Sequence, residues 1–318
     1  MNEALSSPDD DVVVRTRGLT RRFGRSVAVS ELSIEVRRGD VFGFLGPNGA
    51  GKTTTIRMLL GLLRPSAGEI ELFGRPLHRD RLRLLAQVGA LVEQPAFYPW
   101  LTGRENLRAF GYLTGARLGA GRIEEVLELV GLAGRADDRV AIYSQGMRQR
   151  LGIAQALLAR PRLVFLDEPT NGLDPPGIEH IRSLLLRLAR EHGVTVFVSS
   201  HLLHEVERMC NRVAILDRGR LVVSGEVGAL LGGDGTIVEI ETHAVERAAA
   251  LLADTGYRVL GTESDRLRVR ADRTQVAAIA RLLCEHDVGL EALVPRRPSL
   301  EDFFRERLEG PAVAEAVS

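Results

Sequence analysis

One stretch of the sequence fixes a strand, a loop and a helix in a single order: GPNGAGKTTT, residues 46–55. It fits the pattern G-x-x-x-x-G-K-[ST], follows the apolar run VFGFL and opens the helical pattern TTTIRMLLGLL. Gly46, Gly49 and Gly51 allow the backbone to curl so that successive N–H groups point at a phosphate. The following helix adds the positive end of its dipole. The stretch therefore predicts a binding site for a nucleoside triphosphate.

Lys52 is the one lysine among the 42 lysine and arginine residues of the chain. An ammonium on a flexible stem is a compact point charge that can reach the β- and γ-phosphates inside a narrow backbone cradle. A planar guanidinium prefers a bidentate fork and fits such a cradle less well. We infer that this position does not tolerate the arginine that every other basic position carries. The hydroxyl of Thr53 is the expected magnesium ligand.

The composition is that of an ordinary globular chain, and 318 residues are enough for two domains. A net charge of zero argues against broad electrostatic binding of nucleic acid or acidic lipid. No apolar run approaches the roughly 18–20 residues that span a bilayer, and the polar, acidic start is unlike a signal peptide. Cys210 and Cys284 lie far apart, which predicts two buried thiols and no metal or disulfide framework. The chain has the features of a soluble protein of a reducing compartment.

Residues 12–231 alternate β-type runs with helical patterns, which predicts an α/β domain. Three short runs are almost entirely apolar, as in a parallel sheet that is buried on both faces: residues 41–45, 163–167 and 194–200. Residues 95–160 are expected to form a helical subdomain. Within it, Ile123, Val126, Leu127 and Val130 fall on one face of a helix.

A second domain is expected at residues 236–309, after the glycine-rich linker LLGGDG. Strand patterns with alternating apolar and charged residues, such as IVEIE and RLRVR, are separated by helical stripes. The order strand, helix, strand, strand, helix, strand predicts a small α+β, ferredoxin-like unit. Leu300, Phe303, Phe304 and Leu308 lie on one face of a closing helix. Residues 1–11 and 310–318 carry no pattern and are expected to be flexible tails.

Two further patterns point to nucleotide chemistry. The buried strand LVFLDE ends in Asp167, placed to hold the magnesium shell, and Glu168, placed to orient and deprotonate an attacking water. The segment YSQGM precedes the helical run RQRLGIAQALLA. There, Ser144 and the amide of Gly146 could either cap an ordinary helix or bind an anion.

Together these segments resemble the ATP-binding subunit of ABC transporters over residues 12–231. The resemblance implies binding of ATP with Mg²⁺ and hydrolysis in which Lys52, Glu168 and His201 take part. His201, after a buried strand, matches the switch histidine that contacts the γ-phosphate, whereas a lone histidine is usually structural. Phe23 matches the aromatic residue that stacks on adenine, with a core phenylalanine as the rival interpretation. The remaining nucleotide-binding positions that the resemblance implies are Gly46, Pro47, Asn48, Gly49, Ala50, Gly51, Thr53, Thr54, Ser144, Gly146 and Asp174 of the D-loop.

The chain departs from the family pattern in two places. The usual signature L-S-G-G-Q is replaced by Tyr143, Ser144, Gln145, Gly146 and Met147, a variant that resembles antibiotic-type exporters. The glutamine that helps to coordinate magnesium falls on Glu93 or on Gln94, and the sequence leaves both open. GDVFGFLGPNGAGKTTTIRMLLGL, FYPWLTGRENL and the ending SLEDFFRERL are most similar to the ATPases of bacitracin and daunorubicin resistance.

The resemblance implies the cytoplasmic ATPase of a bacterial ABC exporter for an antibiotic, drug or peptide. Two copies would enclose two ATP molecules, and a separate transmembrane permease would dock on residues 95–160. The subunit would then lie on the inner face of the cell membrane without spanning it. Two alternatives are a soluble ABC ATPase of translation or DNA repair, and an ABC importer ATPase with a regulatory C-terminal domain.

Overall fold

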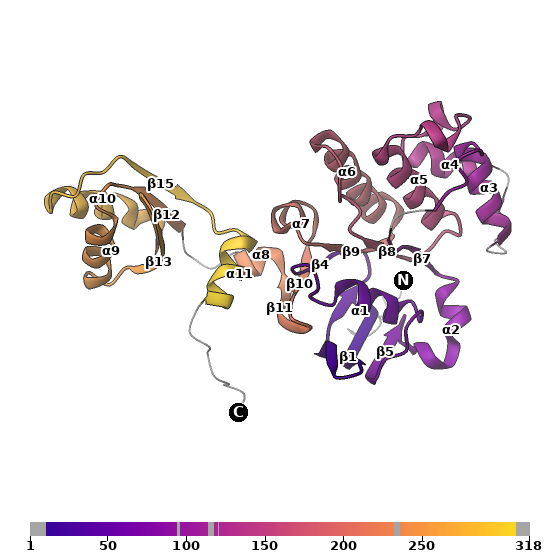
Figure 1. Cartoon of the computed structure of the whole chain (residues 1–318), viewed down its shortest axis with the longest axis horizontal. Helices are drawn as coiled ribbons and strands as arrows, with labels where there is room; N and C mark the ends of the chain where they lie inside the picture. Colours follow the sequence, from indigo (N-terminus) through magenta and orange to yellow (C-terminus); the bar gives the residue numbers. More distant parts are fainter. Residues whose placement is uncertain (1–10, 94–95, 114–117, 120, 232–235, 310–318) are drawn as a thin grey trace, which may run out of the picture. The chain divides into compact units, whose positions relative to one another are not determined.

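The computed structural model describes residues 11–93, 96–113, 118–119, 121–231 and 236–309 (Figure 1). The backbone contacts divide the chain into two compact units, residues 1–225 and 226–318. This division assigns the short helix α8 (Val227–Leu231) to the second unit, whereas the sequence pattern predicts a boundary within residues 232–235. The domain limits given above therefore stay a prediction.

The first unit is built on a six-stranded sheet in the order β11-β10-β4-β9-β8-β7. Three of its four inner strands are the predicted ones and are fully buried: β4 (Val41–Leu45), β8 (Leu163–Asp167) and β9 (Thr195–Ser200). They pair in parallel with one another and with β7 (Val88–Leu91) and β10 (Arg212–Asp217). β11 (Arg220–Glu226) forms the edge. Because the inner strands are parallel, the loops that follow β4, β8 and β9 meet at one edge of the sheet.

A smaller sheet lies against this core in the order β2-β1-β5-β6, with β3 paired to β1. Its strands are β1 (Val12–Phe23), β2 (Ser26–Leu32), β3 (Glu35–Arg37), β5 (Ala67–Leu72) and β6 (Arg75–Pro76). The buried side chains of both sheets form one hydrophobic cluster. At its centre the ring of Phe197 contacts the rings of Phe42, Phe44 and Phe165 at centroid distances of 5.0–5.4 Å. Such aromatic packing holds β4, β8 and β9 in fixed register.

The helices of the first unit follow the predicted rhythm. They are α1 (Lys52–Leu59), α2 (Leu77–Leu85), α3 (Gly103–Leu113), α4 (Arg122–Leu129), α5 (Gln145–Leu157), α6 (Pro175–His192) and α7 (Leu203–Met209). Two short 3₁₀ helices, Ala133–Arg135 and Val140–Ile142, lie between α4 and α5. Helices α3, α4 and α5 pack on one another, as Figure 1 shows, and form the predicted helical region. Val126 and Leu127 of α4 are buried, as their spacing predicts.

The second unit has the predicted succession of elements. They are β12 (Thr236–Glu241), α9 (Val245–Asp254), β13 (Arg258–Glu263), β14 (Arg266–Ala271), α10 (Val276–Glu285), β15 (Ala292–Arg296) and α11 (Leu300–Glu309), with a 3₁₀ turn, Arg273–Gln275, before α10. The sheet is antiparallel, in the order β13-β14-β12-β15. Its assignment to the ferredoxin-like fold stays a prediction. The expectation of two buried thiols is wrong for Cys284, which is exposed because it lies on the outer side of α10, whereas Cys210 is buried.

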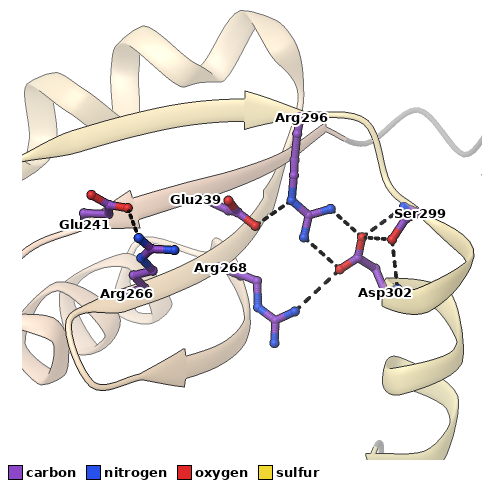
Figure 2. A network of polar contacts seen from close by, with 7 residues as sticks. All are labelled: Glu239, Glu241, Arg266, Arg268, Arg296, Ser299 and Asp302. Carbon is purple, nitrogen blue, oxygen red and sulfur yellow. Dashed lines mark hydrogen bonds and ion pairs between the residues drawn. The ribbon is translucent and has the colours of Figure 1, made fainter. Parts of the chain in front are cut away.

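One face of this second sheet is apolar, and the other carries a network of charges. Val238, Ile240, Leu267 and Val269 pack against α9 and α10. On the opposite face, a network runs from Glu239 of β12 through Arg296 of β15 to Asp302 of α11 (Figure 2). The alternation along each strand separates the two sets of side chains.

Asp302 is the centre of that network. It accepts two hydrogen bonds from the Arg296 guanidinium, at 2.5 and 2.8 Å, and its side chain is 6% exposed. The amide and hydroxyl of Ser299 also donate to Asp302, and the Asp302 amide donates back to the Ser299 hydroxyl. This reciprocal pair is a capping box at the start of α11. The fork of Arg296 therefore fastens α11 to the sheet.

Candidate nucleotide site

The loop after β4 has the backbone that its glycines predict. Gly46, Gly49 and Gly51 have φ angles of 154°, 82° and 101°. A Cβ atom would come within 2.4 Å of the Leu216 carbonyl oxygen at Gly46, and within 2.5 Å of the Ala28 carbonyl oxygen at Gly51. No side chain caps the N-terminus of α1. The first N–H groups of α1 are therefore available to an anion. Pro47, Asn48 and Gly49 form the exposed rim of the loop.

Lys52 is buried inside this loop, with 6% of its side chain exposed. Its Nζ donates to the carbonyl oxygens of Gly46 at 2.7 Å and Pro47 at 3.3 Å. The same nitrogen lies 3.2 Å from the Glu168 carboxylate. The ammonium thus lies between the backbone cradle and an acidic group, where it could exchange the carboxylate for a phosphate.

Asp167 and Thr53, the two predicted magnesium ligands, contact each other. The Thr53 hydroxyl donates to one Asp167 oxygen at 2.8 Å, and Ser199 of β9 donates to the other. The set combines a carboxylate and hydroxyls, the oxygen ligands that Mg²⁺ accepts. Among the described residues no group of three or more His, Cys, Asp and Glu could hold a metal ion. An ion here would need phosphate and water oxygens to complete its shell, which is how Mg²⁺ is usually bound.

Glu168 is held in a left-handed backbone conformation, at φ 49°. Its amide donates to the carbonyl and the hydroxyl oxygen of Ser199, at 3.2 and 3.0 Å. One carboxylate oxygen lies near Lys52, and the other is 2.8 Å from Nδ1 of His201. A left-handed non-glycine residue costs free energy, and such strain is concentrated at functional sites. β8 and β9 therefore aim an acid and a histidine at the loop that holds Lys52.

The predicted glutamine-loop residues are only partly described. Glu93 has φ 67° and pairs with Arg57 of α1. It also lines a cavity of about 530 Å³ that reaches Asp167 and Glu168. Gln94 lies outside the described residues. The choice between Glu93 and Gln94 thus stays open.

Ser144, Gly146 and Asp174 lie at helix starts and not beside Lys52. Ser144 accepts a hydrogen bond from the Met147 amide at 3.2 Å and caps α5. Asp174 accepts one from the Gly177 amide at 3.2 Å and caps α6. Within the part of the chain that the structure describes, no hydrogen bond joins these residues to Lys52. Within one chain, Ser144 and Asp174 thus act as helix caps.

Phe23, at the end of β1, is not a core residue. Its ring is 48% exposed, and the Arg21 guanidinium carbon lies 4.5 Å from the ring centroid. An exposed aromatic face is able to stack on a base, so the adenine role stays a prediction.

Two contacts of the site were not predicted from the sequence. Ser199 orients both Asp167 and the Glu168 backbone, and the serine pair that ends VTVFVSS was the available signal. Gln145 contacts the loop after β8, for which the sequence gives no signal.

Comparisons with known proteins agree with this geometry. Residues 29–171 match the protein family described as "ABC transporter". The chain is 39% identical, over 95% of its length and 99% of the relative's, to the bacitracin transport ATP-binding protein BcrA of Bacillus licheniformis. It is 38% identical, over 92% and 95%, to a daunorubicin resistance ATP-binding protein of Streptomyces coeruleorubidus.

The chain belongs to the ATP-binding subunits of ABC transporters. A solved ATP-binding subunit of an ABC transporter is 29% identical and superimposes with a TM-score of 0.61, covering 69% of this chain and 91% of that one. A dimeric cassette, MJ0796, bound to ADP and phosphate, is 25% identical with a TM-score of 0.60, over 67% and 98%. Both support the ABC fold of the first unit.

As an ABC subunit, the chain binds and hydrolyses ATP for a transporter. No helix among the described residues is both long and apolar enough to cross a membrane. The matched residues 29–171 include the loop after β4 and strand β8.

Proposed function

We propose that two copies of this chain enclose two Mg²⁺–ATP molecules and power export of an antibiotic, drug or peptide through a separate permease. Lys52 and the loop amides would hold the triphosphate, and Thr53 and Asp167 the magnesium, with Glu93 or Gln94 nearby. Glu168 would accept the proton of the attacking water. His201 would stabilise the γ-phosphate and hold the water, and its contact with Glu168 would keep that carboxylate oriented. The names of the bacitracin and daunorubicin relatives support export.

The space around Gly146 is the observation that best supports a dimer of two chains. Among the described residues, an added Cβ atom at Gly146 would meet only a Leu173 methyl group at 3.8 Å, so packing within this part of the chain does not require a glycine there. Ser144 beside it is exposed. A small residue beside an exposed hydroxyl and a helix N-terminus fits the close approach of a phosphate held by a second chain.

Exposed apolar side chains on the helical region support a permease dock. The residues are Tyr98, Trp100, Tyr112, Leu113 and Ile142, each 42–81% exposed. The amides of Ala141 and Val140 donate to the carbonyl oxygens of Pro99 and Leu101, so the backbone before Ile142 lies against the backbone that flanks Trp100. Clusters of exposed large apolar residues mark interaction sites. Docking there would place the subunit on the inner face of the cell membrane.

Mixing two inactive variants tests the pairing. Lys52→Ala removes the cradle charge, and Ser144→Arg places a bulky cation at the signature. A dimer of either variant alone has no intact site, whereas a mixed dimer has one. ATPase activity should therefore return on mixing, and specific activity should rise with protein concentration. Ser183→Arg, which adds the same side chain on an exposed part of α6, is the control and should stay active. Constant specific activity without rescue would contradict the proposal.

The export direction needs a separate experiment. A strain that lacks the gene should become more susceptible to at least one compound of an antibiotic panel. Restoring the wild-type gene, but not the Glu168→Gln gene, should reverse the effect. Unchanged susceptibility to the whole panel, with impaired uptake of a nutrient, would favour an importer.

A further inference from the structure

Gln145 connects the signature segment to the loop that follows the catalytic strand. It is the first residue of α5, and its Nε2 donates to the Asn171 carbonyl oxygen at 3.1 Å. The amide also packs over Gly172, where a Cβ atom would lie 2.4 Å from Nε2. The contact therefore uses both a hydrogen bond and the absence of a side chain at Gly172.

The Asn171 backbone is in turn bonded to Glu168. The Asn171 amide donates to the Glu168 carbonyl oxygen at 3.1 Å, and Leu173 closes the next turn on Thr170 at 3.3 Å. Glu168 is the strained residue at φ 49°, whose carboxylate contacts Lys52 and His201. A shift of the turn at 168–171 would therefore rotate the carboxylate that faces the nucleotide.

The contacts from Gln145 through Asn171 to Glu168 connect two different nucleotides in the proposed dimer. Glu168 serves the ATP held by its own chain, whereas Ser144, next to Gln145, faces the ATP held by the partner. A glycine, the usual residue at this signature position, has no side chain to reach Asn171.

We propose that Gln145 is a positioning residue that couples the two ATP sites of the dimer. When the partner's nucleotide orders the start of α5, the Gln145 amide transmits the shift to Asn171 and so to Glu168. One hydrogen bond is worth enough to change a coupled rate by about two- to tenfold. The inference rests on the proposed dimer, and its effect is cooperativity between sites.

Three substitutions at this position separate hydrogen bonding from shape. Gln145→Leu keeps the approximate volume but removes the donor. Gln145→Glu places a carboxylate against the Asn171 carbonyl oxygen, which adds repulsion. Gln145→Lys restores a donor on a longer stem. Gln155→Glu, on the same helix and without a hydrogen bond from its side chain to the loop at 171–172, is the control for added charge.

The readouts are the Hill coefficient of ATP hydrolysis, the affinity for ATP and the melting temperature of the full chain. We expect the Leu and Glu variants to lower the Hill coefficient from near 2 toward about 1 and turnover by about two- to tenfold. ATP affinity and melting temperature should not change, and Gln145→Lys should recover cooperativity. A Hill coefficient that stays at the wild-type value in both variants would overturn the inference.

A separate measurement tests the proposed dimer, so an error in the dimer can be distinguished from an error in the coupling through Gln145. Glu168→Gln protein should form an ATP-dependent dimer in size-exclusion chromatography. If it does and the Gln145 variants keep wild-type cooperativity, only the coupling is wrong. If no dimer forms and the wild-type Hill coefficient is about 1, the dimer and the coupling are both wrong.

Discussion

The two units each contain a network of carboxylates and basic groups, but the networks are built differently. In the first unit the cation is the single lysine, held at 3.2 Å from Glu168 by one point contact. In the second unit the central cation is Arg296, which binds Asp302 through two nitrogens and Glu239 through a third, and Arg268 lies 3.5 Å from Asp302 (Figure 2). The first network lies at a loop that is open to phosphate, and the second is closed by a capping box.

The difference follows from what each contact has to do. A lysine ammonium makes contacts that can be exchanged one at a time, so Lys52 can leave Glu168 for a phosphate. An arginine fork matches a carboxylate with two parallel hydrogen bonds and holds it in one orientation. We infer that Arg296 makes a permanent contact, whereas Lys52 makes a contact that a phosphate can replace. Four substitutions test this comparison.

The largest effect is expected for Lys52→Arg. The charge is kept, but the guanidinium does not fit the cradle formed by the Gly46 and Pro47 carbonyl groups. Hydrolysis should fall by about 10³-fold or more, on the scale of losing a main charge-stabilising group. Steady-state ATPase assays measure the rate, and circular dichroism checks that the variant is folded. A variant with most of its activity would show that shape at this position is unimportant.

Glu168→Gln should have the next largest effect. Loss of a general base costs about 10²–10⁴-fold in turnover. ATP binding should persist, because the carboxylate is not part of the phosphate cradle. Turnover is measured by phosphate release, and binding by equilibrium titration with labelled ATP. Turnover close to that of the wild type would remove Glu168 from the role of base.

Asp302→Asn tests the permanent network in the second unit. The substitution leaves the Arg296 fork without its carboxylate, so local stability should fall by about 2–4 kcal/mol. Hydrogen exchange of the β12 and β15 amides, or denaturant unfolding, measures the loss. ATP binding by the first unit should not change. Asp254→Asn, an exposed acid of α9, is the control and should be neutral.

The stability that Asp302 contributes to the second unit should decrease as the pH falls. Burial alone would raise the pKa of Asp302, but hydrogen bonds from Arg296 and Ser299 outweigh it and lower that pKa. The stabilisation is therefore complete above the unfolded pKa of about 4 and disappears as the pH falls below it. The difference in stability between wild type and Asp302→Asn should be constant from pH 8 to about pH 4 and then shrink. A difference that grows on acidification would contradict the assignment.

Local patterns indicated the residues of the candidate site, but they did not indicate the Gln145–Asn171 contact or the network around Asp302. The loop after β4 follows from glycines and a lysine at fixed spacing, and the acids at 167–168 follow from the end of a buried strand. The contact of Gln145 with Asn171 joins residues 26 positions apart, and its geometry depends on how α5 packs. Glu239 was predicted to lie on the charged face of its strand, but no periodicity reveals that Asp302 would reach that face.

Arg296→Lys should have the smallest effect and bears most directly on the comparison. A single ammonium can satisfy either Asp302 or Glu239 with good geometry but cannot form the fork, so we expect a loss of about 1–2 kcal/mol in the second unit. Arg281→Lys, on the exposed side of α10, is the matched control and should change stability by less than about 0.5 kcal/mol. Equal stability of Arg296→Lys and wild type would mean that the fork adds nothing to the charge. The scarcity of lysine in this chain would then need another cause. If Arg296→Lys is measurably less stable and Lys52→Arg does not hydrolyse ATP, neither residue can replace the other.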